Sequence, residues 1–260
     1  ELEKLKSEFS EDIILLYYNP LEKDSMKIDD PDWIKHYLDL VESQRAIVII
    51  YGPGGNLNSG ILIAHIFRKK LDLYTCFVPF TSCSALNYIL LKSDKLYLSK
   101  NSKITLIDPI IDIEENGVII TDRLIKLIKH SDSNVAELAR TQFCRIRDLV
   151  FKCLDDKPSL FNYKKDLILT ESEQKEQIVD IFLNKESHYS EISYKELKEM
   201  NLKVKLLSES SLDEPKIISS SKKIIKYCQQ MVEEKKGNFL LTTTSNLIGY
   251  EQKILIRNCS

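Results

Sequence analysis

The stretch Ala46-Ile-Val-Ile-Ile-Tyr-Gly-Pro-Gly-Gly55 decides the fold that we predict for this chain. Its first six residues are apolar or aromatic without polar alternation, which is typical of a central parallel strand covered on both faces. The glycine-rich loop follows directly, residues 57 to 70 have the spacing of a helix, and residues 74 to 78 form a second strand-like run. Strand, helix and strand predict a right-handed βαβ unit.

Glycine is rare in this sequence, and its placement is informative. Of the seven glycines among 260 residues, four fall between positions 52 and 60, namely Gly52, Gly54, Gly55 and Gly60. Soluble proteins contain about 7% glycine on average. A chain this sparing with glycine uses it at this loop for backbone geometry that side chains would prevent.

The alternation of strands and helices extends outward in both directions. Residues 13 to 18 read as a strand, and Asp29-Asp30-Pro31 begins a helix because proline suits the first helical turn. Downstream we predict helices and strands at residues 85–93 (helix), 95–98 (strand), 120–130 (helix), 134–154 (helix), 173–183 (helix), 193–201 (helix) and 204–207 (strand). The pattern predicts an α/β domain over residues 1–207.

The last fifth of the chain differs in composition. Residues 208–218 are polar and serine-rich and lead to Pro215, which predicts a linker. Beyond them, residues 219–235 have amphipathic helical spacing, and residues 238–243 and 253–257 resemble strands. We expect residues 219–260 to form a small appendage or to pack on a partner.

Charge and cysteine content exclude several classes of function. Lys and Arg number 37 against 39 Asp and Glu, and they are interspersed, so a nucleic-acid-binding role is not expected. Six single cysteines without a Cys-x-x-Cys pair or Cys/His cluster predict reduced thiols, no metal site and a cytoplasmic protein. We expect no cofactor.

The apolar runs are too short for a membrane helix. The longest, such as Ala46 to Tyr51, fall far below the roughly 20 residues that span a bilayer. Because the sequence begins at Glu1 and not at Met, we expect that an anchor or targeting segment could precede it and associate the protein with a membrane.

A glycine loop after a parallel strand suggests two kinds of chemistry. A phosphate-binding loop requires a Lys before its Ser, but Asn58 stands before Ser59. An oxyanion hole instead uses backbone N–H groups to stabilise a carbonyl oxygen as it becomes negative, and glycine leaves room for the substrate. This second reading needs a nucleophile at the head of the helix after the next strand, and Ser84 lies there.

Four blocks, in order along the chain, resemble the serine dehydrogenase proteinase family. They are the Pro-Gly-Gly loop at 53–55, the Ser-Ala helix that begins at Ser84, Ile107-Asp108-Pro109-Ile110, and residues 182–202 with their Ser187-His188 pair. That family belongs to the ClpP/crotonase superfamily and is related to signal peptide peptidase A-type enzymes. The resemblance covers about residues 13–207 and implies repeated ββα units, a parallel central sheet flanked by helices, and a homo-oligomer.

The resemblance also implies roles for individual residues. Ser84 would be the nucleophile of a serine peptidase that cleaves peptide or protein substrates through an acyl-enzyme. The N–H groups of Gly54 and Ala85, with Gly55 beside them, would form the oxyanion hole. The family context also makes His188 and Asp108 candidates for the catalytic set.

The sequence does not identify one residue as the general base. Clp-type enzymes supply a His where this chain has the Asp108-Pro109 step, and signal-peptide-peptidase-type enzymes supply a Lys where it has Thr141. Lys126, Lys129 and His130 are further candidates, although the apolar residues around them also predict the solvated face of a helix. The alternative is a catalytically impaired member that serves as an oligomerisation or peptide-binding scaffold.

Structural readings stand beside each functional one. Ser84 could simply cap the following helix, as serine often does. Cys83 could be a thiol nucleophile, although a small buried cysteine is more common at such a turn. The glycine loop could be a tight turn without chemistry, and Asp108 and His188 could be ordinary turn and surface residues.

Overall fold

The computed structural model describes residues 1–20, 26–107, 109–115, 118–155, 160–164, 169–183, 190–234, 237–244 and 255–258. Among these, the central sheet has seven strands in the order β10 (Val204–Leu206), β5 (Lys95–Leu98), β3 (Leu73–Val78), β2 (Arg45–Tyr51), β1 (Asp12–Tyr18), β11 (Gly237–Thr243) and β12 (Leu255–Asn258). The first five pair parallel to one another, whereas β11 pairs antiparallel with both β1 and β12. The predicted α/β fold with a mostly parallel central sheet flanked by helices is confirmed.

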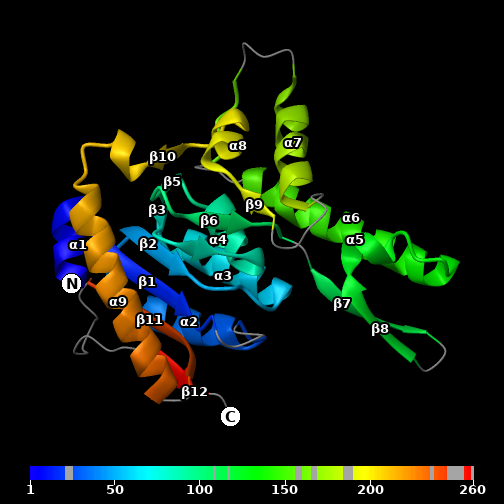
Figure 1. Ribbon diagram of the computed structural model, residues 1–260, viewed down its shortest axis with the longest axis horizontal. Helices are drawn as coiled ribbons and strands as arrows, with labels where there is room; N and C mark the ends of the chain where they lie inside the picture. The colour runs from blue at the N-terminus through cyan, green and yellow to red at the C-terminus, as the bar shows by residue number, and fades with distance from the viewer. Residues whose placement is uncertain are drawn as a thin grey trace.

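Strand alternation divides the core into two layers. In β1, Ile13, Leu15 and Tyr17 pack on one face, and Ile14, Leu16 and Tyr18 pack on the other. The first face is covered by α1 (Leu2–Phe9) and α9 (Glu214–Glu234). The second face is covered by helices α2 (Asp30–Asp39), α3 (Leu57–Lys70) and α4 (Asn87–Leu91), as Figure 1 shows. Helix α6 (Ser133–Asp155) packs on α4, and α7 (Glu171–Leu183) packs on α6, so both extend the same hydrophobic cluster. Burial on both faces explains why the central strands lack polar alternation.

A second, smaller sheet lies beside the end of β2. It consists of β4 (Thr81–Ser82), β6 (Lys103–Thr105) and β9 (Glu191–Ile192), in that order. Strand β4 is parallel to β6, and β9 is antiparallel to β6 and pairs Glu191 with Thr105. A bridge between Gly52 and Ser82 joins this sheet to the glycine loop. The helix α8 (Tyr194–Glu199) follows β9 and begins with a capping box from Ser193 and Glu196.

The predicted helix at 120–130 is wrong over its first part. Residues Ile110–Glu115 (β7) and Val118–Arg123 (β8) pair antiparallel, and only Leu124–Leu127 (α5) is helical before α6. The run Val118-Ile-Ile-Thr121 is β-branched, which favours a strand. Asn116-Gly117 stands between the two strands, and this dipeptide is a strong sequence signal for a hairpin. The hairpin projects from the body of the molecule near α5 and α6 (Figure 1).

The C-terminal residues add to the main sheet. Helix α9 begins at Glu214, inside the segment predicted as a linker, and packs against α1 and β11. Strand β11 pairs with β1 in a register that places Leu16 opposite Leu241. The residues predicted as a small appendage therefore share a sheet and a hydrophobic layer with the N-terminal part of the chain.

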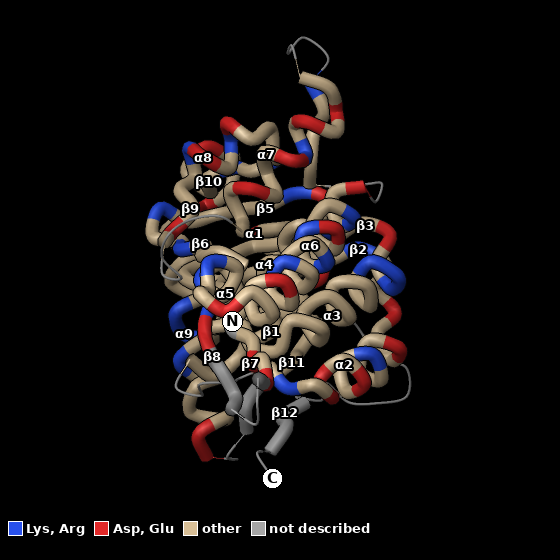
Figure 2. The backbone as a smooth tube through the Cα atoms, turned by 90° about the vertical axis from the view of Figure 1, so that its right-hand side faces the viewer, with Lys and Arg blue, Asp and Glu red and all other residues tan. Residues whose placement is uncertain are grey.

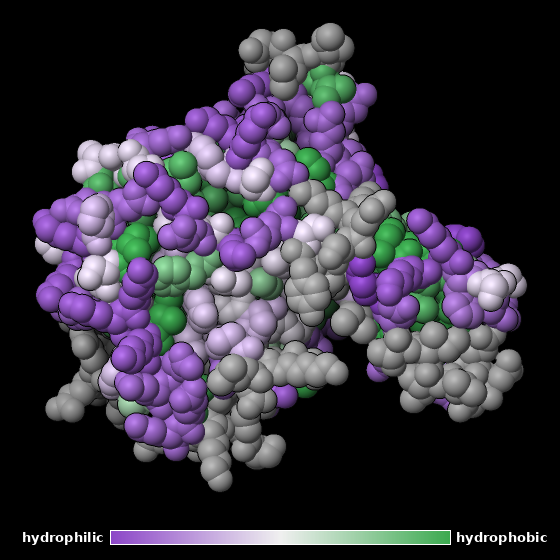
Figure 3. Space-filling view, in the orientation of Figure 1, coloured by the Kyte–Doolittle hydropathy of each residue, from purple (hydrophilic) through white to green (hydrophobic). Residues whose placement is uncertain are grey.

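Charges of both signs are mixed over the helices, as Figure 2 shows, in agreement with the interspersed sequence pattern. Hydrophobic side chains appear between charged ones on the face in Figure 3, including the end of the molecule that carries α5 and α6.

The five cysteines in the described part of the chain are free thiols, at positions 76, 83, 144, 153 and 228. Within the same residues, no helix is long and apolar enough to cross a bilayer and no metal-binding cluster occurs.

Candidate active site

The glycine loop and the turn at Ser84 lie against each other. A Cβ atom placed on Gly54 would lie 2.6 Å from the Cys83 carbonyl oxygen and 2.9 Å from Ser84 Cβ. Real Cβ atoms do not approach backbone this closely, so only glycine fits at position 54. Gly60, at the start of α3, is equally constrained, because its Cβ would lie 2.4 Å from the Ala85 carbonyl oxygen. The two segments predicted to converge are therefore in contact.

Gly55 faces a different neighbour. Its added Cβ would lie 2.5 Å from the backbone nitrogen of Met26, and Met26 forms a bridge with Gly55. Of the two loop glycines predicted for the oxyanion hole, the one packed against Ser84 and Ala85 is Gly54.

Ser84 has a left-handed backbone conformation, with a φ of 51°. Among the described non-glycine residues, positive φ values occur at two further positions, Ser10 (57°) and Asn201 (59°). Ser10 and Asn201 follow directly on α1 and the end of α8, where this conformation commonly ends a helix. Ser84 instead lies where a strand leads into a helix, and its left-handed conformation costs roughly 1–2 kcal/mol. Backbone strain of this kind is concentrated at functional sites, and it presents a nucleophile at the top of a sharp turn.

Backbone hydrogen bonds hold this strained turn in place. The Gly52 amide donates to the Thr81 carbonyl oxygen at 3.1 Å, and the Cys83 amide donates to the Gly52 carbonyl oxygen at 3.2 Å. The Ser84 amide donates to Thr105 Oγ1 at 3.3 Å. The turn is thus tied to the glycine loop on one side and to β6 on the other.

Ala85 supplies the backbone donor nearest to the nucleophile. Ala85 is fully buried, and its amide makes no hydrogen bond to the part of the chain that the structure describes. A side chain at position 54 would place its Cβ 3.1 Å from the Ala85 nitrogen. Glycine at position 54 therefore avoids crowding this amide, which an oxyanion donor requires.

The helix that follows is shorter than predicted. Residues Ser84–Leu86 form a 3₁₀ turn, and α4 itself spans Asn87–Leu91. The N-cap position of the turn is Cys83, and no side-chain cap hydrogen bond is made there. The reading of Ser84 as a helix cap is therefore not supported.

Cys83 has the environment of a buried thiol. Burial raises its pKa, and the nearby Glu191 carboxylate raises it further, whereas a hydrogen bond with Thr105 and the Lys103 ammonium lower it. A raised pKa leaves little of the reactive thiolate at neutral pH. This environment favours Ser84 over Cys83 as the nucleophile.

An ion pair that no sequence pattern indicated lies close to the turn. Lys103 Nζ is 2.6 Å from Glu191 Oε1, and the side chains of Lys103 and Glu191 are 59% and 50% exposed. Lys103 lies on β6 two residues before Thr105, so the side chains of Lys103 and Thr105 lie on the same face of that strand. Hydrogen bonding to Glu191 raises the pKa of Lys103, which keeps it a cation and makes it a poor general base.

Two predicted catalytic residues, Asp108 and His188, lie outside the described residues. The three other candidate bases are described. Lys126 Nζ lies 3.3 Å from Asp122 Oδ1, and His130 Nδ1 accepts a hydrogen bond from the Asp132 amide at 3.1 Å. Across the ranges given above, Ser84 Oγ makes no hydrogen bond to any of them or to another side chain.

The phosphate-loop alternative is not supported. Asn56 caps α3, and its Oδ1 accepts hydrogen bonds from both the amide and the hydroxyl of Ser59. Ser59 is fully buried by this arrangement. Its hydroxyl is not placed to contact a phosphate or a bound cation.

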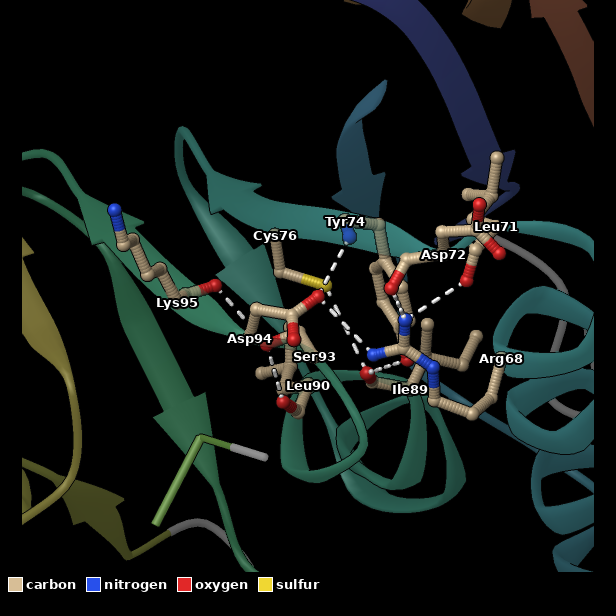
Figure 4. Close-up of polar contacts among 10 residues, drawn as sticks. All are labelled: Arg68, Leu71, Asp72, Tyr74, Cys76, Ile89, Leu90, Ser93, Asp94 and Lys95. Carbon is tan, nitrogen blue, oxygen red and sulfur yellow. Dashed lines mark hydrogen bonds and ion pairs between the residues drawn. The ribbon is translucent and has the colours of Figure 1, made fainter. Parts of the chain in front are cut away.

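A second buried polar cluster lies at the other end of the segment that begins with Ser84 (Figure 4). Asp94 Oδ2 accepts hydrogen bonds from Arg68 Nη1 at 3.1 Å and from the Tyr74 amide at 2.7 Å. Arg68 also donates to the carbonyl oxygens of Leu71 and Asp72 and lies over the Tyr74 ring. These bonds join α3, β3 and the residue directly before β5.

Comparison with known proteins gives similarities in structure alone. No protein-family model matches the chain, and no curated protein matches it in sequence. A variant of the 1510-N membrane-bound stomatin-specific protease is 13% identical, with 86% of this chain and 85% of that chain covered and a TM-score of 0.47. A second variant, in complex with a substrate peptide, is 13% identical over 94% and 85% of the chains, with a TM-score of 0.48.

ClpP1 from Listeria monocytogenes is also similar. It is 15% identical, 78% of this chain and 94% of that chain are covered, and the TM-score is 0.44. Identities and TM-scores this low assign no role to any residue, so the roles below are argued from the geometry of this chain.

Proposed function

We propose that this chain is a serine hydrolase that cleaves peptide bonds through an acyl-enzyme on Ser84. The observation that carries the proposal is the left-handed Ser84, half-buried at a strand-to-helix turn and packed against Gly54. Ser10 adopts this conformation where it ends α1, whereas Ser84 ends no helix and begins one, so helix termination does not account for its strain. The peptide substrate is taken from the resemblance of the sequence to serine peptidases.

In the proposed reaction Ser84 Oγ attacks the carbonyl carbon of the scissile bond, and its proton passes to a base. The carbonyl oxygen becomes negative and accepts a hydrogen bond from the Ala85 amide, with Gly54 as the second backbone donor. When this intermediate collapses, the base returns the proton to the leaving nitrogen, the amine departs and an ester remains on Ser84, which water then hydrolyses. His188, with Asp108 to orient it, stays our candidate for the base.

The alternative proposal is a scaffold that binds peptides or oligomerises without catalysis. It is favoured by the absence of a base at Ser84 Oγ within the described ranges. The homo-oligomeric state and the cytoplasmic or membrane-associated location also stay predictions, which sedimentation and fractionation of the full protein would test.

A fluorophosphonate probe separates the two proposals, because it labels only a serine that is activated as a nucleophile. We expect labelling of the wild-type protein that Ser84→Ala abolishes. Ser43→Ala is the matched control, since Ser43 is also half-buried but lies at the opposite end of β2, with its hydroxyl bonded to the Arg45 carbonyl oxygen. A folded wild-type protein that is not labelled would favour the scaffold.

A variant of the neighbouring thiol completes the test. Cys83→Ala should keep most of the labelling, because the thiol is not the proposed nucleophile. Loss of labelling in a folded Cys83→Ala protein would argue against Ser84 as a nucleophile that acts independently of the thiol.

A further inference from the structure

A closed set of buried hydrogen bonds lies beneath the nucleophile turn. Ser82 Oγ donates to Asn87 Oδ1 at 2.8 Å, and Asn87 Nδ2 donates to the Thr105 carbonyl oxygen at 2.6 Å. Thr105 Oγ1 in turn accepts the Ser84 amide at 3.3 Å. Ser82 and Asn87 are fully buried, and Thr105 is 8% exposed. Residues on both sides of Ser84 are therefore tied to one residue of β6.

The hydroxyl of Thr105 has a defined orientation in this set. Its oxygen accepts a hydrogen bond from the Ser84 amide at 3.3 Å, and its hydrogen is donated to the Leu106 carbonyl oxygen at 3.5 Å. One hydroxyl thus connects the strained turn to the backbone that follows β6. Buried polar groups that are satisfied in this way specify a single local geometry.

The arrangement also assigns different tasks to the two amides at the turn. Because the Ser84 amide donates its hydrogen bond to Thr105 Oγ1, the Ser84 amide is not directed at a substrate. The Ala85 amide, which makes no hydrogen bond within the described ranges, is the one left for an oxyanion. A shift of the Ser84 amide away from Thr105 would rotate the peptide that links Ser84 and Ala85 and so move both the nucleophile and this donor.

We propose that Thr105 is a positioning residue for Ser84: its hydroxyl holds the strained turn so that Ser84 Oγ and the Ala85 amide meet the same carbonyl group. Asn87 acts one step further away, because it fixes the Thr105 backbone. This inference rests on the proposed hydrolase function for its effect on rate, but the positioning itself can be measured without catalysis.

The first measurement is the rate of fluorophosphonate labelling in Thr105→Val, which keeps the shape and removes the hydroxyl. A misplaced nucleophile reacts roughly 10- to 100-fold more slowly. Thr105→Ser keeps the hydroxyl and should label within about threefold of the wild-type rate. Thr75→Val is the matched control, since Thr75 is 9% exposed in β3 and its hydroxyl makes no hydrogen bond within the described residues.

The dependence of labelling on pH distinguishes positioning from proton transfer. Removal of the Thr105 hydroxyl changes the placement of Ser84, so the rate should fall by the same factor at every pH with an unchanged midpoint. A displaced midpoint would show that Thr105 takes part in proton transfer and would overturn the inference. Labelling of Thr105→Val at the wild-type rate would overturn it as well.

The second measurement is hydrogen exchange of the Ser84 amide, which needs no activity. We expect faster exchange in Thr105→Val, and wild-type exchange in Thr105→Ser and Thr75→Val. Unchanged exchange in Thr105→Val overturns the inference even if the protein never labels. Absence of labelling together with faster exchange contradicts the hydrolase proposal and leaves the positioning role supported.

Discussion

The segment from Ser84 to Asp94 is held by buried polar side chains at both of its ends, but the two ends are built differently. At Asp94 the backbone is unstrained, and a carboxylate, a guanidinium and a backbone amide meet in the interior. At Ser84 the backbone is left-handed and the residue stays half-buried. The Ser84 hydroxyl makes no hydrogen bond within the described residues, whereas the hydroxyl of Ser93 makes two.

This difference separates structural polar groups from groups that are available for chemistry. The Asp94 end uses its polar atoms to connect α3, β3 and α4, and a substitution there should cost stability. At the Ser84 end the backbone is strained and the hydroxyl of a half-buried residue makes no hydrogen bond within the described residues, so a substitution there should lower activity while stability changes little or improves. The four predictions below test this contrast.

The largest effect is expected at Asp94. Asp94→Ala removes one partner of a buried ion pair and leaves the Tyr74 amide without its acceptor, so the free energy of unfolding should fall by about 3–5 kcal/mol. Urea denaturation followed by circular dichroism measures this change. Glu199→Ala is the control, because the pair between Lys195 and Glu199 is exposed and 3.7 Å long. A loss below about 1 kcal/mol for Asp94→Ala would mean that this end is not the structural one.

The next effect is expected at Gly54. Gly54→Ala places a methyl group against the Cys83 carbonyl oxygen at a φ of 94°, so the free energy of unfolding should fall by roughly 1–3 kcal/mol. Labelling at Ser84 should be lost, because the methyl group also occupies the space in front of Ala85. Asn58→Ala, at an exposed position of α3, should change neither property. Normal labelling of a folded Gly54→Ala protein would argue against the proposed oxyanion hole.

A pair of substitutions should give effects of opposite sign at the two ends. Ser84→Gly should be more stable than Ser84→Ala by about 1 kcal/mol, because alanine is strained in the left-handed backbone conformation and glycine is not. At Ser93, where φ is negative, Ser93→Gly should be less stable than Ser93→Ala by about 0.5–1 kcal/mol. Thermal unfolding of the four variants measures both differences. The same sign at both positions would contradict the strain assigned to Ser84.

The smallest effect concerns two thiols, one at each end. Cys76 is fully buried within the Asp94 cluster and Cys83 is partly exposed beside Ser84, and burial raises the pKa of both. Since the thiolate is the reactive form, a thiol reagent at pH 8 should modify Cys83 more slowly in the folded protein than in urea, and Cys76 more slowly still. The rate at Cys83 should continue to rise above pH 9. Mass spectrometry of tryptic peptides over a pH series reads both sites, and equal rates at the two cysteines would contradict the difference in access.

The sequence predicted those parts of the molecule that depend on local pattern. The strand before Gly52 and the helix after Asn56 could be predicted, because β-branched runs and clustered glycines act over a few residues. The meeting of the glycine loop with Ser84 could be predicted as well, because the two segments follow consecutive parallel strands, which usually lie side by side. The helix expected over residues 120–130 failed for the same kind of reason, since apolar residues at 124–128 outweighed the strand signal of the preceding run. The Asn116-Gly117 dipeptide was the signal that could have corrected it.

The remaining features depend on contacts between distant residues. Thr105 meets Ser84 because β4 and β6 pair in one register, and Glu191 meets Lys103 through the pairing of β9 with β6. A shift of one residue in either register would turn these side chains to the other face, so no local pattern could have predicted the contacts. The same holds for β11, whose place beside β1 is set by the sheet as a whole.

The pairing of β11 with β1 has a consequence for how the protein is made. The Ile13 amide donates to Thr244 Oγ1 at 2.7 Å, across 231 positions of the chain. During translation β1 therefore keeps one edge without its final neighbour until the residues of β11, more than 200 positions later, have also left the ribosome. An open strand edge of Ile, Leu and Tyr residues invites pairing with other chains, so truncation before residue 237 should produce an aggregating protein. The nascent chain would then depend on chaperones for as long as that edge waits for its partner.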